Sequence, residues 1–74
     1  MSRRALDPRA RQIELDVSDA ERHAFTLSEL DENGGWIDMI QVYGSYSAAR
    51  RGAERVSRRT GLPIVVRHMH PAFS

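Results

Sequence analysis

Alternating apolar and polar residues mark a β-strand near the start of the chain. Between residues 11 and 17 every second side chain is apolar, namely Ile13, Leu15 and Val17, and a strand places such side chains on one face of a sheet. Residues 18–22 then predict a turn, or a single helical turn capped by Ser18. Segments 23–30 and 36–43 are rich in strand-forming residues and flank the turn sequence D-E-N-G-G, so together they predict a β-hairpin.

A helical period replaces this alternation after residue 45. At about 100° per residue, one face of segment 46–60 collects small and apolar side chains: Tyr46, Ala49, Gly52, Ala53 and Val56. Ser45 is suited to the N-cap, Gly61 fits the left-handed position after the last turn, and Pro63 prevents continuation of the helix. The apolar run I-V-V within residues 62–69 predicts a final strand.

These elements predict an α+β fold. Its small, mainly antiparallel β-sheet is built from a strand, a β-hairpin and a last strand after the helix, and the one amphipathic helix packs on one face. A chain of 74 residues has room for a single domain, residues 1–74, and buries only about 60% of its unfolded surface. Residues 1–10 and 70–74 lie outside the predicted elements, and we expect them to be flexible.

Charge is segregated along the chain, although the net charge is only +1. Residues 1–13 carry four arginines and one acid, residues 14–38 carry eight acids and one arginine, and residues 39–74 carry six arginines and one acid. Every basic residue is arginine, a bias that GC-rich codon usage produces by itself and that suggests a bacterial or phage gene. The positions of the arginines are therefore more informative than the preference for this residue type.

Cysteine usage and the first residues bear on the compartment. The absence of cysteine excludes disulfides and thiolate zinc sites. The N-terminal residues contain no apolar run of the length that a signal peptide or a membrane anchor needs. We therefore expect a soluble, cytoplasmic protein with no membrane partner.

The arginines of the predicted helix form the first candidate site. Arg51, Arg55 and Arg58 recur at spacings of four and three residues on the face opposite the apolar one, with Arg59 on its flank. Such a stripe can bind phosphates or an acidic protein surface through paired guanidinium contacts, or it can be a solvated helix face. Tyr46, if partly exposed beside the stripe, would be an aromatic anchor for an interface.

A second candidate surface is acidic. Asp31 and Glu32 lie at the tip of the predicted hairpin, and Asp38 lies in the strand that follows. Glu14 and Glu29 alternate with apolar residues, so we expect both to face away from the helix and the two charge signs to lie on opposite sides. This surface can occupy a basic groove of a partner by imitating nucleic acid, or it can serve only to prevent edge-to-edge aggregation of the sheet.

Other candidate chemistry finds little support. His68 and His70 would project to the same side of an extended chain, but no third metal ligand follows at a fixed spacing, so we predict no metal site. Sequence motifs of nucleophilic hydrolases, zinc proteases and P-loop enzymes are absent, and we predict a non-enzyme without a cofactor. The large aromatics near the hairpin, Phe25 and Trp36 among them, are expected in the core rather than on a base-stacking surface.

One part of the chain resembles a known family in its layout. The segment from Glu29 through the glycine turn to Trp36, and on through Gly44 and Tyr46 to the alanine-containing helix, is similar to HicB-type antitoxins, which also pass from a glycine-turned hairpin into such a helix. The arginine-rich helix of this chain departs from that pattern. The resemblance therefore does not assign the chain to the family.

Two classes of function fit these observations. The first is a small non-enzymatic protein-binding module, an inhibitor or adaptor of the kind that phages and mobile elements encode, comparable in size and charge to anti-CRISPR proteins. It would act by electrostatic occupation of a site on another protein or on a protein–nucleic acid complex. The alternative is direct nucleic-acid binding through the arginine-rich helix face, against which the acidic middle of the chain weighs. A homodimer is also compatible, because opposite charged faces can pair between subunits.

Overall fold

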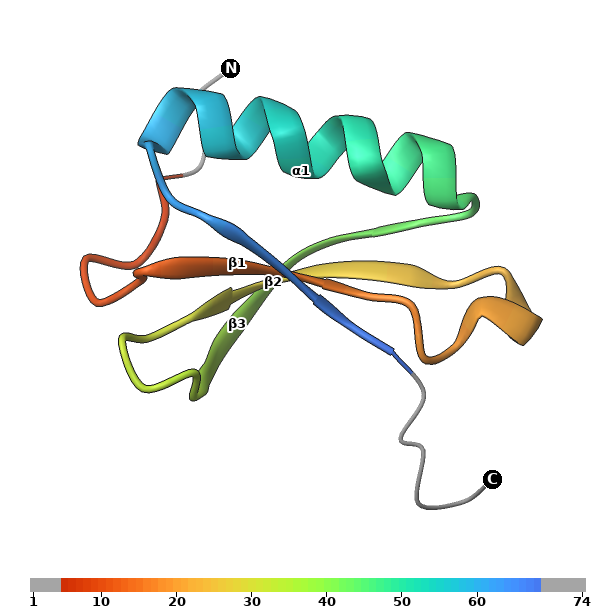
Figure 1. Ribbon diagram of the computed structural model, residues 1–74, viewed down its shortest axis with the longest axis horizontal. Helices are drawn as coiled ribbons and strands as arrows, with labels where there is room; N and C mark the ends of the chain where they lie inside the picture. The colour runs from red at the N-terminus through yellow and green to blue at the C-terminus, as the bar shows by residue number, and fades with distance from the viewer. Residues whose placement is uncertain (1–4, 69–74) are drawn as a thin grey trace.

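The computed structural model describes residues 5–68, which form a sheet with an α-helix lying on one of its faces (Figure 1). In chain order the elements are β1 (Gln12–Asp16), the 3-10 helix η1 (Ala20–Arg22), β2 (Phe25–Leu30), β3 (Trp36–Tyr43), α1 (Tyr46–Thr60) and β4 (Ile64–Arg67). The α+β fold class expected from the sequence is confirmed, with strand and helix positions close to those predicted.

The sheet is mixed. Its strand order is β3-β2-β1-β4, with β1–β2 and β2–β3 antiparallel and β1–β4 parallel. A parallel pair needs a crossover connection, and here the chain leaves the β3 edge, runs through α1 across one face of the sheet and returns as the opposite edge strand, β4 (Figure 1). This crossover places α1 on one face of the sheet, and the side of the helix that points away from the sheet is exposed to solvent.

Both ends of α1 are capped as the sequence predicts. The Ser45 hydroxyl accepts a hydrogen bond from the backbone N–H of Ala48 at 3.2 Å. At the other end Gly61 takes the left-handed conformation, with φ of 78°, and its N–H donates to the carbonyl of Ser57 at 2.7 Å. The caps satisfy backbone groups that a helix end leaves unpaired, so the helix is held at both termini.

The core lies between α1 and the two central strands. Leu15 of β1, Phe25 and Leu27 of β2, and Ala49 and Ala53 of α1 are buried together. Because the helix contributes alanines here, its backbone approaches the sheet closely. Hydrophobic burial by these few side chains is the main term that holds the two layers together.

A glycine in α1 makes room for a tyrosine of the sheet. Gly52 is buried, and a Cβ atom added there would lie 2.6 Å from Cζ of Tyr43. Tyr43 packs against the core from β3, and its hydroxyl donates to Oε1 of Gln41 at 3.4 Å. The Tyr43 side chain therefore fills the space between helix and sheet into which a side chain at position 52 would project.

Two local predictions prove wrong. The first is that Ser18 caps the helical turn: the N-cap position of η1 is Asp19, which makes no side-chain cap bond. Ser18 instead donates from its hydroxyl and its N–H to Oδ1 of Asp16 at 2.6 and 2.9 Å. Trp36 is not a core residue: its exposed fraction is 62%, and its pairing with Leu30 places it on the face away from α1. Register shifts in the β2–β3 pairing alter the simple alternation along β3.

Candidate interaction site on helix α1

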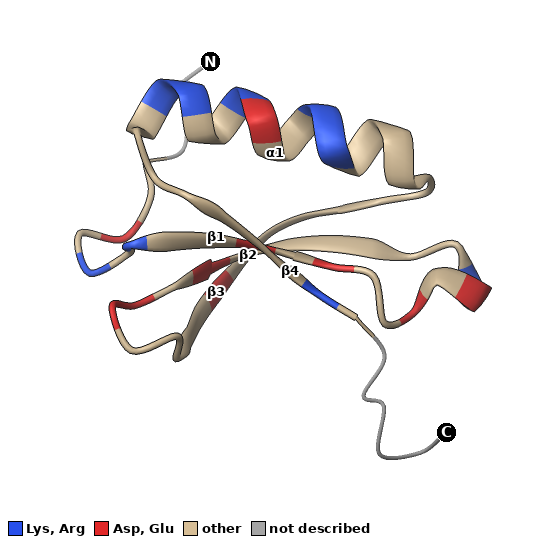
Figure 2. Cartoon of the chain, in the orientation of Figure 1, with Lys and Arg blue, Asp and Glu red and all other residues tan. Residues whose placement is uncertain are grey.

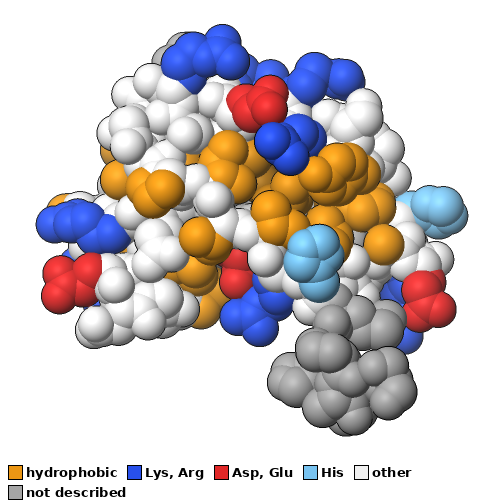
Figure 3. Space-filling model, viewed as in Figure 1, with side chains coloured by type: hydrophobic (Ala, Val, Ile, Leu, Met, Phe, Trp, Pro, Cys, Tyr) orange, Lys and Arg blue, Asp and Glu red, His pale blue; other side chains and the backbone are white. Residues whose placement is uncertain are grey.

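The outer side of α1 carries the arginines that the sequence singles out. Arg51, Arg55, Arg58 and Arg59, here called the arginine ridge, are all exposed. Basic side chains gather over α1 in Figure 3, and Figure 2 shows acidic positions mainly in the sheet and its loops. The face opposite the ridge is buried through Ala49, Gly52, Ala53 and Val56, as the helical period predicts.

Most of the ridge has no partner among the residues that the structure describes. Among residues 5–68, Arg55, Arg58 and Arg59 make no hydrogen bond or ion pair, and Arg51 only donates to the Ser47 hydroxyl at 3.2 Å. Three of the ridge arginines border a shallow hollow of about 270 Å³ together with Glu54. The ridge thus presents mostly unpaired guanidinium groups on a helix that is capped at both ends.

Glu54 and Tyr46 both engage Arg50, which lies beside the ridge. Nε of Arg50 donates to the carboxylate of Glu54 at 3.1 Å, and its Nη1 donates to the hydroxyl of Tyr46 at 3.1 Å. The hydrogen bond with Tyr46, and then that with Glu54, raises the pKa of Arg50. Glu54 therefore forms its ion pair with Arg50 and none with the ridge arginines, although it borders the hollow between them.

Tyr46 lies on a different flank of α1 from the ridge. At about 100° per residue, it sits roughly 140° around the helix from Arg51. The residue is 44% exposed, and its ring meets Phe25 edge-on, with ring centroids 6.2 Å apart. Tyr46 is exposed enough for an interface, but it would contact a partner beside Arg50 and not at the centre of the ridge.

The acids at the hairpin tip have different roles in the structure. Asp31 shapes the turn, because its Oδ1 accepts the N–H groups of Asn33 and Gly35, each at 2.8 Å. Glu32 is exposed, and both acids share a hollow of about 220 Å³ with Arg9 and Arg11. The predicted acidic surface is therefore interleaved with arginines at this end.

The other acids lie within the strands of the sheet. Asp38 is exposed on β3, where it pairs in register with Glu29. Glu14 lies on the face away from α1, as expected, but it is buried and accepts a 2.8 Å hydrogen bond from Nε of Arg67. This ion pair raises the pKa of Arg67. Glu14 is thus buried in an ion pair and does not add to the exposed acidic surface predicted for Asp31, Glu32 and Asp38.

Glu29 faces α1, so the expectation that it faces away is wrong. It pairs in register with Ile13 and lies in phase with Phe25 and Leu27, and only 2% of it is exposed. If the apolar Leu30 is taken to face the helix, Glu29 beside it must face the opposite way. Counting by two from Phe25 and Leu27 would have placed Glu29 on the inner face, because strand side chains alternate with a period of two.

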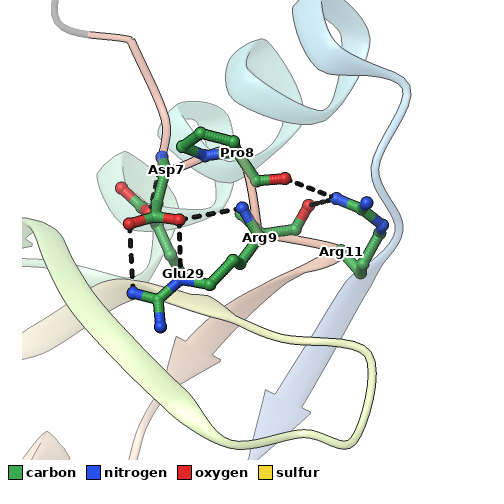
Figure 4. A network of polar contacts seen from close by, with 6 residues as sticks. Asp7, Pro8, Arg9, Arg11 and Glu29 are labelled. Carbon is green, nitrogen blue, oxygen red and sulfur yellow. Dashed lines mark hydrogen bonds and ion pairs between the residues drawn. The ribbon is translucent and has the colours of Figure 1, made fainter.

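A folded N-terminal segment contacts Glu29 (Figure 4). The N–H of Asp7 donates to Oε1 of Glu29 at 3.0 Å. The carboxylate of Asp7 in turn accepts the N–H, Nε and Nη2 of Arg9 at 2.8, 3.1 and 3.2 Å. The side-chain hydrogen bonds from Arg9, followed by the backbone one, lower the pKa of Asp7. This network holds the segment against β2.

Between α1 and β3 lies a cavity of about 230 Å³, here called the Glu29 pocket. It combines a buried carboxylate, two ridge arginines, polar groups of β3 and a few apolar side chains. The lining residues are Leu6, Glu29, Ile40, Gln41, Tyr43, Arg55, Val56 and Arg59. The pocket thus joins the arginine ridge to an acid that the sequence analysis did not select.

Comparison of the chain with protein-family models, with curated proteins and with solved structures gives no match.

Two further findings concern other kinds of site. Within residues 5–68, no group of three or more His, Asp or Glu side chains is arranged to hold a metal ion. His68 is exposed, and His70 lies outside the described residues. In the same part of the chain, no helix combines the length and apolar character needed to cross a membrane.

Proposed function

We propose that this protein is a small non-enzymatic binding module, an inhibitor or adaptor, that docks the arginine ridge of α1 onto an acidic surface of a partner protein. The observation that carries the proposal is the absence of intramolecular partners for Arg55, Arg58 and Arg59 among residues 5–68. Unpaired like charges on one helix face destabilise a helix slightly. A partner that supplies carboxylates would relieve this repulsion and gain paired, charge-assisted hydrogen bonds.

The ridge is a better contact surface than the acids. Asp31 is engaged in its own turn and Glu14 is buried in an ion pair with Arg67. Recruiting either acid to a partner would first break these contacts. The ridge arginines need no such rearrangement, so binding through them breaks no existing ion pair, and its main cost is the rotamer entropy of the side chains that become immobilised.

Nucleic-acid binding is the second candidate, supported by the same unpaired guanidinium groups. If the four ridge arginines neutralised four phosphates, the logarithm of the binding constant would fall with the logarithm of salt at a slope of about −3.6 on duplex DNA. Acids lie close to the ridge, with Glu54 at the hollow and Glu29 in the adjoining pocket. These acids would repel phosphates and partner carboxylates alike, but a partner protein can place its carboxylates to avoid them, whereas a regularly spaced phosphate backbone cannot. This difference ranks nucleic-acid binding second.

Fluorescence anisotropy with two kinds of labelled probe separates the candidates. One is a short poly-glutamate peptide, and the others are duplex DNA and single-stranded RNA, each at low and physiological salt. The test variant is Arg58→Glu, and the matched control is Arg22→Glu, which makes the same charge change at an exposed arginine of η1. We expect poly-glutamate binding that Arg58→Glu weakens and Arg22→Glu retains. Circular dichroism confirms that each variant is folded.

Two outcomes would contradict the protein-binding proposal. Tight, salt-steep binding to nucleic acid that Arg58→Glu abolishes would make the protein a nucleic-acid module. Equal weakening by Arg58→Glu and Arg22→Glu would show that only net charge matters, without a defined ridge site. If the expected pattern holds, affinity capture is repeated with the wild-type protein, Arg58→Glu and Arg22→Glu as baits. The wild type and Arg22→Glu should recover a partner that Arg58→Glu loses.

A further inference from the structure

We propose that the Glu29 pocket receives a basic side chain, arginine or lysine, from the partner protein that the arginine ridge contacts. The inference rests on the proposed function and adds the chemistry of the partner. The matching surface is acidic overall and carries one basic residue flanked by carboxylates. The basic residue would enter the pocket, and the carboxylates would meet the ridge.

Glu29 is a buried carboxylate whose acceptor capacity is mostly unused. Only 2% of it is exposed, and Oε1 accepts one hydrogen bond, from the N–H of Asp7. Among residues 5–68 no donor reaches Oε2, and because no fully buried side-chain oxygen in this part of the chain lacks a partner, Oε2 is open to solvent. A carboxylate offers about four acceptor sites, and burying the charged form is costly unless cations or several donors satisfy it. A guanidinium or ammonium group supplies both charge and donors.

The arginines that line the pocket, Arg55 and Arg59, do not pair with Glu29. Their positive charge at the pocket would repel a lone cation. A basic side chain that arrives with neighbouring carboxylates avoids this repulsion, because those carboxylates pair with Arg55 and Arg59.

The size and lining of the pocket suit one side chain. Its volume of about 230 Å³ lies below the roughly 300–1,000 Å³ of pockets that take drug-sized ligands. Ile40 and Val56 provide apolar wall. Long basic side chains bury their aliphatic stems against such walls while the charged head reaches a polar group, here the carboxylate of Glu29.

Two blocked tripeptides test the inference. The first is acetyl-Asp-Arg-Asp-amide, and the second replaces arginine by citrulline, which is nearly isosteric but uncharged. Binding is followed by amide chemical shifts in ¹⁵N-labelled protein. We expect the arginine peptide to shift the amides of Glu29, Gln41 and Tyr43, and the citrulline peptide to bind about ten- to a hundredfold more weakly, as loss of a charged hydrogen-bonding group implies.

Substitutions identify the groups involved. Glu29→Gln keeps an oxygen that can accept from Asp7, so the fold should persist, but it removes the charge and should weaken the arginine peptide by a similar factor. Glu32→Gln, at the exposed hairpin tip, is the matched control and should leave binding unchanged. Arg59→Gln should weaken binding, because a peptide carboxylate loses its partner. If Arg59 instead neutralises Glu29 within the free protein, Arg59→Gln would strengthen binding.

The outcomes for the pocket and for the ridge are distinguishable. Three results would each overturn the pocket inference. The two peptides could bind equally tightly, Glu29→Gln could bind the arginine peptide as tightly as the wild type does, or Arg59→Gln could bind it more tightly. Poly-glutamate binding that Arg58→Glu weakens would at the same time leave the proposed function standing. Conversely, selective binding of the arginine peptide that Glu29→Gln abolishes would support the pocket even if Arg58→Glu had no effect on poly-glutamate.

Discussion

Gly52 and Tyr43 should be energetically coupled, and the size of the coupling follows from their contact. A methyl group at position 52 would meet Cζ of Tyr43 at 2.6 Å and Cε1 at 3.2 Å. Gly52→Ala therefore has to displace the ring. Overpacking of this kind costs about 1–3 kcal/mol, whereas replacing glycine by alanine within a helix gains about 1 kcal/mol. The net change in the wild-type background should range from near zero to about 2 kcal/mol of destabilisation.

Tyr43→Leu provides the background in which only the helix gain remains. Leucine lacks each of the three Tyr43 side-chain atoms nearest to the added methyl, namely the hydroxyl oxygen and the ring carbons Cζ and Cε1. In that background Gly52→Ala should stabilise the protein by about 1 kcal/mol. The double-mutant cycle should therefore give a coupling free energy of about 1–3 kcal/mol.

Urea unfolding followed by far-ultraviolet circular dichroism measures the four proteins of this cycle. A domain of this length has a total stability of roughly 4–11 kcal/mol, so all four should remain folded at low urea. Additivity of the two substitutions would refute the steric explanation. So would a Gly52→Ala variant that is stabilised in the wild-type background by the full helix gain.

Three further predictions concern other contacts. Ser45→Ala removes the N-cap acceptor of α1 and should cost about 1 kcal/mol in urea unfolding; no loss would show that the cap is dispensable. Arg67→Met leaves the buried carboxylate of Glu14 without its partner and should cost about 1–3 kcal/mol, part of which Glu14→Gln should restore in the double variant; purely additive losses would contradict this. The pKa of Asp7 is below its ordinary value of 3.8, so its contact with Arg9 contributes stability above that pH that is lost as the pH falls through the folded-state pKa. In Arg9→Gln the pKa measured by NMR should rise toward 3.8, and an unchanged value would rule out Arg9 as the cause.

The sequence was sufficient to predict the elements whose sequence signals lie within the element itself. Ser45 and Gly61 mark the ends of α1 through their own side-chain and backbone chemistry. The helical period also placed the arginine ridge opposite the buried face, since that relation depends only on spacing along one helix. These features needed no knowledge of how the strands pair.

Features that depend on pairing between distant segments were harder to predict. The orientation of Glu29 follows from its register with Ile13 on the neighbouring strand, and the apolar Leu30 beside it concealed that phase. The exposure of Trp36 accompanies irregular pairing between β2 and β3. The Glu29 pocket draws its walls from the N-terminal segment, two strands and α1, so spacing within any one element could not reveal it.

The parallel pairing of β1 with β4 also has a kinetic consequence. Strands β1, β2 and β3 follow one another through short turns, whereas Ile13 meets Ile64 only after most of the chain has been placed. Closing a longer loop costs more entropy, by about 0.6 kcal/mol for each doubling of its length. The three-stranded meander should therefore form early and α1 with β4 dock onto it late. The arginine ridge belongs to that late unit, so a transient release of α1 from the meander would dismantle the proposed binding surface while most of the sheet stays paired.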